Sequence, residues 1–311
     1  MPGEHVVLVM SHAIHHRRKR LNIRPQNHQP KKDPAPMPSS ASPLELTALK
    51  AVILGIIEGL TEFLPVSSTA HLLLSQPFIG VDNKDPFVIA FSIIIQFGAI
   101  LAVVALYWKK LLVDRKVILR VIAAFIPTGV LYLIFKVVVD DALKRSELHL
   151  AMLAIGGVVI ILFETWHREK PDGQEHLEEA SYRDCMLLGC FQAIAMIPGV
   201  SRSAATILGA LTLGWKRKAA VEFSFLLAVP TMAAATLKEL YEHQSSLALE
   251  HFQILAVGFV TSFLVAILAV KFLLSFIRTY TFIWFGVYRI LVGGIGLIAM
   301  FGFGVKFELP E

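Results

Sequence analysis

The chain has 311 residues, of which 55% are hydrophobic and 17% are charged, and its mean hydropathy is +0.64. A soluble domain of this size needs more polar side chains to cover its surface, so the composition excludes an ordinary soluble protein. The formal net charge of +5 is carried by short Lys and Arg runs between apolar segments. This distribution is typical of a membrane protein, so we expect the lipid bilayer, and no nucleic acid, as a partner.

The first 45 residues form a basic, proline-rich tail. Residues 15–20 read HHRRKR, and five prolines fall between positions 25 and 38. Such a segment cannot form a hydrophobic core, and its apolar stretch at residues 6–10 is too short for a signal peptide. We expect residues 1–45 to be a disordered tail, with Met37 as an alternative start of translation.

Apolar windows recur from residue 44 onward and are separated by charged turns. Six of them approach the roughly 20 residues that a bilayer demands. They cover residues 87–108, 121–139, 148–166, 219–237, 252–274 and 282–303. The sequence therefore predicts six transmembrane helices.

Two further apolar segments, residues 46–79 and 186–214, are interrupted by polar residues and a proline. The first contains Glu58, Glu62, Pro65, Ser67, Ser68, Thr69 and His71, and the second contains Gln192, Pro198, Gly199, Ser201, Arg202, Ser203 and Thr206. Buried charges and non-helical backbone survive at membrane depth only where protein or a wet cavity encloses them. We interpret both segments as re-entrant helix-loop-helix elements.

The two interrupted segments match each other. A shift of 134 residues pairs Gly55 with Gly189, Ser67 with Ser201 and Thr69 with Ser203, although chance similarity between apolar helices is an alternative. Each half, residues 46–170 and 183–305, would hold one re-entrant segment and three spans. An odd number of spans inverts the second half, so the expected fold is an all-α integral membrane protein in an inverted-topology repeat.

Lys and Arg concentrate in the loops on one side of this arrangement, at residues 109–120, 168–183, 216–218 and 271–278. Cation-rich loops face the cytoplasm. This count places the N-terminus outside.

Glu58 and Glu62 are one helical turn apart, so both carboxylates project from one face. Paired carboxylates that share a site with phosphate oxygens suit a hard divalent cation, Mg²⁺ or Ca²⁺. A proton-relay or helix-packing pair is the alternative. The pair is the candidate metal site.

Three hydroxyls and a histidine follow Pro65, namely Ser67, Ser68, Thr69 and His71. Helix capping alone explains at least one of the hydroxyls. His71 lies three residues after Ser68, close enough for its imidazole to share a proton with a neighbouring hydroxyl or a water molecule. The cluster indicates acid-base or nucleophilic chemistry.

The second segment is typical of an anion cradle. Gly199 sets a turn, the following helix offers free N–H groups, and Arg202 adds a planar donor fork. Ser201, Ser203 and Thr206 add hydroxyl donors. A phosphate or carboxylate ligand would offset the cost of burying Arg202, and neutralisation by a glutamate of the first segment is the alternative. Gln96, Glu222 and Arg289 either line the same cavity or pair locally.

Taken together, three motifs closely resemble the undecaprenyl-diphosphatase family of the bacitracin-resistance type. They are EGLTEFLPVSSTAH at 58–71, PGVSRS at 198–203 and EFSFLLAVP at 222–230. The resemblance implies hydrolysis of undecaprenyl diphosphate to the monophosphate carrier used for peptidoglycan, in the bacterial cytoplasmic (inner) membrane. We further expect a polyprenyl diphosphate substrate, a site opening to the outer face, and a homodimer.

The resemblance also implies roles for five residues. Glu58 and Glu62 would support metal-dependent catalysis, Ser68 nucleophilic attack, His71 acid-base work and Arg202 binding of the diphosphate. An activated water in place of Ser68 remains open. Two alanines, at positions 70 and 204, replace glycines usual in the family, which questions fine geometry and not chemistry. A transporter or flippase of a phosphate-bearing or anionic substrate is the alternative function.

Overall fold

The computed structural model describes residues 46–139, 145–242, 251–305 and 307. The expected tail at 1–45 and the alternative start at Met37 lie outside these residues. The described part of the chain is helical and contains no β-strand, only an isolated bridge between Gln174 and Trp215. The expected all-α class is confirmed.

Six helices in the described residues are long and apolar enough to cross a membrane. They are α4 (Pro86–Leu112), α5 (Arg115–Val139), α6 (Ser146–Trp166), α9 (Arg217–Glu242), α10 (Phe252–Phe276) and α11 (Ile283–Phe303). Each coincides with an expected span, and most are extended by a few residues at the ends. Local capping explains one extension, because the Asp85 side chain accepts a hydrogen bond from the amide of Phe87 and Pro86 occupies the first turn.

Each interrupted segment contains two short helices joined by a loop. The first holds α2 (Ala48–Thr61) and α3 (Ser68–Phe78), and the second holds α7 (Tyr182–Ile194) and α8 (Arg202–Thr212). A short 3₁₀ helix, η1 (Leu177–Glu179), precedes α7. The two loops, residues 62–67 and 195–201, are called here the first loop and the second loop.

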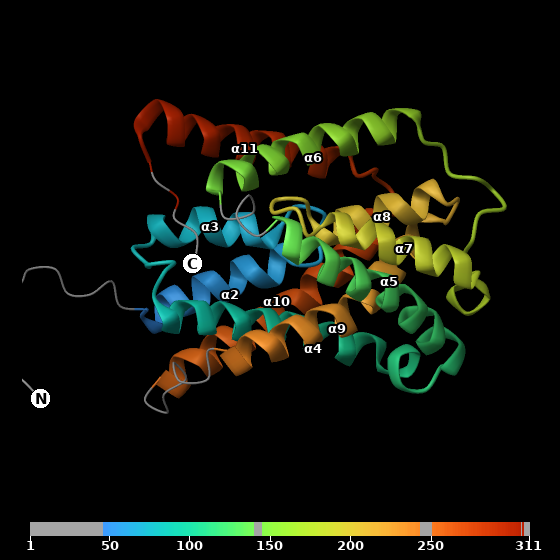
Figure 1. Ribbon diagram of the computed structural model, residues 1–311, viewed down its shortest axis with the longest axis horizontal. Helices are drawn as coiled ribbons and strands as arrows, with labels where there is room; N and C mark the ends of the chain where they lie inside the picture. The colour runs from blue at the N-terminus through green and yellow to red at the C-terminus, as the bar shows by residue number, and fades with distance from the viewer. Residues whose placement is uncertain (1–45, 140–144, 243–250, 306, 308–311) are drawn as a thin grey trace, which may run out of the picture. The chain divides into compact units, whose positions relative to one another are not determined.

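The short helices pack against the long ones (Figure 1). Helix α2 lies along α10, α7 lies along α5, and α6 runs beside α11. Close approach depends on glycine, because a Cβ on Gly189 of α7 would lie 2.0 Å from the carbonyl oxygen of Ala124. These contacts position α2 and α7, and therefore the two loops that follow them.

Candidate functional site

The first loop turns sharply before α3. Ser67 has a φ of 71°, and it is the one non-glycine residue with a positive φ in the described part of the chain. Its side chain makes no capping hydrogen bond, contrary to the simplest capping interpretation. Its carbonyl oxygen instead accepts hydrogen bonds from the backbone amide and from the ring Nδ1 of His71. Backbone strain of this kind concentrates at functional sites.

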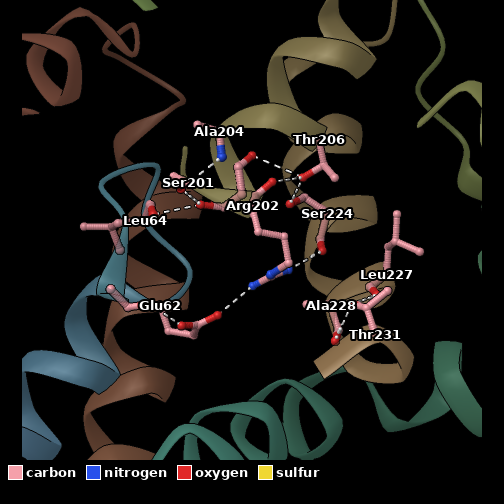
Figure 2. Close-up of polar contacts among 12 residues, drawn as sticks. Glu62, Leu64, Ser201, Arg202, Ala204, Thr206, Ser224, Leu227, Ala228 and Thr231 are labelled. Atoms are coloured by element: carbon pink, nitrogen blue, oxygen red, sulfur yellow. Dashed lines mark hydrogen bonds and ion pairs between the residues drawn. The ribbon is translucent and has the colours of Figure 1, made fainter. Parts of the chain in front are cut away.

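A chain of polar contacts joins Ser68, Glu62 and Arg202. The Ser68 hydroxyl donates to Glu62 Oε2 at 2.5 Å, and Arg202 Nη2 lies 3.0 Å from Glu62 Oε1. Figure 2 shows Arg202 reaching from α8 across to Glu62, where the ion pair brings the two loops together. Of the two alternatives for Arg202, neutralisation by a first-segment glutamate is therefore what this structure contains. All three residues lie next to one another.

His71 has a different partner from the one that its spacing suggests. Its Nε2 lies 2.7 Å from the hydroxyl oxygen of Tyr288 on α11, and the two rings are stacked at 5.5 Å. With Nδ1 directed at the Ser67 carbonyl, Nε2 is the natural acceptor for the Tyr288 hydroxyl. The imidazole is thus held in one orientation, and the proton of Ser68 is directed to Glu62.

The hydroxyl groups of the second segment form hydrogen bonds with other groups of the protein. Ser201 Oγ accepts from the amide of Ala204, and Ser203 Oγ donates to the Leu64 carbonyl at 2.8 Å (Figure 2). Thr206 donates to carbonyl oxygens of its own helix and lies 2.5 Å from the hydroxyl of Ser224 on α9. Ser203 thereby forms a second link between the loops.

Glu58 is buried, with 1% of its surface exposed, and its Oε1 has no hydrogen-bond partner. It lines a small cavity of about 210 Å³ together with Ser68, Thr69 and Gln96. Within the described ranges, no group of three or more His, Cys, Asp or Glu side chains is arranged so that it could hold a metal ion. An unpartnered buried carboxylate oxygen fits a cation that takes its remaining ligands from substrate phosphate.

A larger cavity of about 540 Å³ lies beside the Ser68, Glu62 and Arg202 contacts. Polar groups in or next to both loops line it, namely Glu62, Ser67, Ser68, Thr69, Ser201 and Arg202. The rest of its lining combines apolar residues, among them Phe125, Met196, Met232, Ala234 and Ala235, with polar ones, among them Thr128, His149, Gln192, Lys238 and Glu239. Of the expected site residues, Glu58, His71, Ser203 and Thr206 do not line this cavity. This lining suits a ligand that has an anionic head group and an apolar tail.

The other polar residues of the spans, expected either to line the cavity or to pair locally, differ in this respect. Gln96 lines both cavities, whereas Glu222 pairs with Lys110 at 2.5 Å. Arg289 is fully buried near the loops. Tyr288 is not predicted from the sequence, because a tyrosine in an apolar span gives no signal by itself, although the neighbouring Arg289 marks this part of the span as polar.

Comparison with known proteins identifies the family. The profile of the family described as Bacitracin resistance protein BacA matches residues 51–295. The chain belongs to this family. Its relatives include an undecaprenyl-diphosphatase of Sulfurihydrogenibium sp. that is 47% identical over 249 residues, covering 80% of this chain and 97% of the relative. Those of Campylobacter jejuni and Aquifex aeolicus are 49% and 44% identical, covering 79% and 80% of this chain and 91% and 96% of the relative.

All five residues expected to react lie within this matched range of the BacA family. The structure brings Glu62, Ser68 and Arg202 into direct contact. Glu58 lies at the smaller cavity and His71 lies against Tyr288. The candidate site is therefore the cluster of Glu62, Ser68 and Arg202, where the first loop meets the starts of α3 and α8, with Glu58 and His71 at its periphery.

Proposed function

We propose that this protein hydrolyses undecaprenyl diphosphate to undecaprenyl phosphate and inorganic phosphate. Family membership and the names of the relatives support this activity. The observation that carries it is the contact chain from Arg202 through Glu62 to Ser68, because all three residues line one cavity together with apolar side chains. That arrangement offers a nucleophile, a proton acceptor and a cation to a phosphate whose lipid chain lies among apolar side chains.

In the first step, the Ser68 oxygen attacks the terminal phosphorus. Its proton passes to Glu62 Oε2, which already accepts its hydrogen bond, so attack does not require a charged alkoxide to form first. The bond between the phosphorus and the bridging oxygen breaks, and undecaprenyl phosphate leaves, taking the proton from Glu62. Arg202 stabilises the negative charge that develops on the phosphoryl oxygens.

In the second step, water attacks the phosphorus of the phosphoserine. Glu62 accepts a proton from the water, inorganic phosphate leaves, and the proton returns to the Ser68 oxygen. Direct attack by an activated water, the other route open from the sequence, would leave the hydrogen bond between Ser68 and Glu62 without a chemical role.

We propose that Glu58, with Glu62, holds a divalent cation, Mg²⁺ or Ca²⁺, when substrate is bound. The cation would neutralise charge on the diphosphate oxygens. The unpartnered Oε1 of Glu58 supports this proposal, and the engagement of both Glu62 oxygens with Ser68 and Arg202 makes Glu58 the stronger ligand candidate.

We also propose the inverted repeat with two re-entrant segments. A shift of 134 residues carries α2 and α3 onto α7 and α8 to within one residue, and the three long helices of each half to within four. Glycine contacts follow the same shift. A Cβ on Gly55 would lie 2.7 Å from Gly258 O, and one on Gly189 would lie 2.0 Å from Ala124 O, and both 55/189 and 124/258 differ by 134. Such reciprocal contacts support a pseudo-two-fold axis.

The site is proposed to open to the outer, periplasmic face. Lys238 and Glu239, near the end of α9, line the larger cavity, whereas residues 216–218, a cationic run, lie at the start of that helix. If the cationic run is cytoplasmic, the mouth of the cavity lies outside. The homodimer stays a prediction.

Purified protein in detergent tests the activity directly. Given undecaprenyl diphosphate and Mg²⁺ or Ca²⁺, it should release one inorganic phosphate for each undecaprenyl phosphate formed. Folded protein that binds the lipid without releasing phosphate would contradict hydrolysis and favour the transporter or flippase alternative, which the names of the relatives do not favour.

A further inference from the structure

Arg289 of α11 is a buried arginine whose partners are all backbone carbonyl groups. Its side chain is among the largest that are fully buried, with 1% of the residue exposed. Nε donates to the carbonyl of Leu153 at 3.1 Å, and Nη2 donates to that of Met152 at 3.3 Å, both on α6. Half of its contacts therefore fix it to a neighbouring span.

The other contacts of Arg289 are to the two loops of the site. Nη1 donates to the Pro65 carbonyl at 3.1 Å, in the first loop, and Nη2 donates to the Gly199 carbonyl at 3.0 Å, in the second. Pro65 lies three residues before Ser68, and Gly199 lies three residues before Arg202. One guanidinium thus holds both backbones immediately ahead of the residues that meet at Glu62.

The charge of Arg289 is not used in an ion pair. No carboxylate of the described residues lies within ion-pair distance of it, unlike Arg202, which pairs with Glu62. A buried cation without a carboxylate is costly in a membrane protein. Four of its five N–H donors are already directed at carbonyl oxygens, so its place in the fold is explained by what it holds together.

We propose that Arg289 is a positioning residue that sets the distance between the two loops, so that Arg202 and Ser68 meet at Glu62. This inference rests on the proposed phosphatase function. Arg289 itself does not line the cavity and would not touch the diphosphate. A guanidinium is needed because its planar fork reaches four carbonyl groups in fixed directions, whereas a lysine ammonium is a point charge with three donors.

Gly156 of α6 provides an independent way to disturb the same contacts. A Cβ at this position would lie 2.2 Å from Arg289 Nη2, so an alanine must displace the guanidinium while leaving its charge intact. Gly294, on α11, has nothing within 4 Å of its Cβ position and offers a matched Gly→Ala control.

The experiment measures kcat, KM and thermal unfolding of purified full-length protein carrying Arg289→Lys, Gly156→Ala or Gly294→Ala, with undecaprenyl diphosphate as substrate. Displacement of reacting groups by about 1 Å costs on the order of 10²-fold, so we expect Arg289→Lys to lower kcat by about that factor. KM should rise by less than about threefold, because the groups that touch substrate remain. Gly156→Ala should lower kcat in the same manner, and Gly294→Ala should match the wild type.

Three results would overturn the proposal. They are a folded Arg289→Lys protein with near-normal kcat, a loss confined to KM, and a Gly156→Ala protein that behaves as Gly294→Ala does. If Arg289→Lys does not fold, the comparison of the two glycine variants decides. Phosphate release by the wild type tests the phosphatase function separately, so failure of this proposal leaves that function standing.

Discussion

The two loops lead into equivalent helices, but the first residues of these helices differ in their chemistry. Ser68 is the first residue of α3 and Arg202 is the first residue of α8, and they are 134 positions apart. Both contact Glu62, one as a hydroxyl donor and the other as a cation. In the proposed mechanism, equivalent helix starts thus carry the nucleophile in one half and the anion-binding group in the other, so the chemistry would depend on the difference between the halves.

The largest expected effect comes from removing the proposed reacting group at the start of α3. Ser68→Ala should lower kcat by about 10³-fold or more, because the nucleophile is lost while binding groups remain. Phosphate release from undecaprenyl diphosphate measures it. Ser75→Ala, in the same helix and bonded only to the Leu72 carbonyl, is the matched control and should stay active. Near-normal turnover of Ser68→Ala would sink the serine mechanism.

Removing the cationic side chain at the start of α8 should have the next largest effect. Arg202→Ala leaves Glu62 without its ionic partner and the phosphoryl oxygens without a donor fork, so we expect kcat to fall by about 10²- to 10³-fold. Arg202→Lys should lie between this variant and the wild type, because it keeps the charge without the fork. Equal turnover of the wild type, Arg202→Ala and Arg202→Lys would show that the proposed separate roles of Ser68 and Arg202 are wrong.

Glu58→Gln, near the end of α2, tests the metal proposal. The amide is a weaker ligand for a hard cation, so the Mg²⁺ concentration for half-maximal activity should rise about tenfold, with kcat at saturating Mg²⁺ much less affected. A metal titration of activity measures this shift. Glu175→Gln, on the exposed loop before α7, is the control. An unchanged titration curve for Glu58→Gln would remove this residue from the metal site.

The smallest effect should come from the orientation of His71. Tyr288→Phe removes the hydroxyl that lies 2.7 Å from Nε2 while keeping the stacked ring, so we expect kcat to fall by about tenfold. Steady-state kinetics measure the change, with Tyr280→Phe at an exposed position as the control. Equal activity of the two variants would show that His71 needs no support from α11.

Much of the fold follows from the sequence because membrane helices have a strong local signal. Stretches of about 20 apolar residues and the polar interruptions around Pro65 and Pro198 locate the helices and both loops. The pairing of Arg202 with a glutamate of the first segment is one of the two alternatives that the sequence offers, but the partners of His71 and Arg289 do not follow, because they come from distant parts of the chain. The contact of His71 with Tyr288 spans 217 positions, and those of Arg289 with the loops span 224 and 90. Spacing alone suggests local partners such as Ser68.

Following the terminal phosphate during turnover shows directly whether Ser68 is the nucleophile. Wild-type protein is mixed with undecaprenyl diphosphate labelled in its terminal phosphate, quenched at short times, digested and mapped. We expect label on the peptide that contains Ser68, and its loss on further incubation as inorganic phosphate appears. Release of labelled phosphate with no label on Ser68 at any time would contradict this role of Ser68.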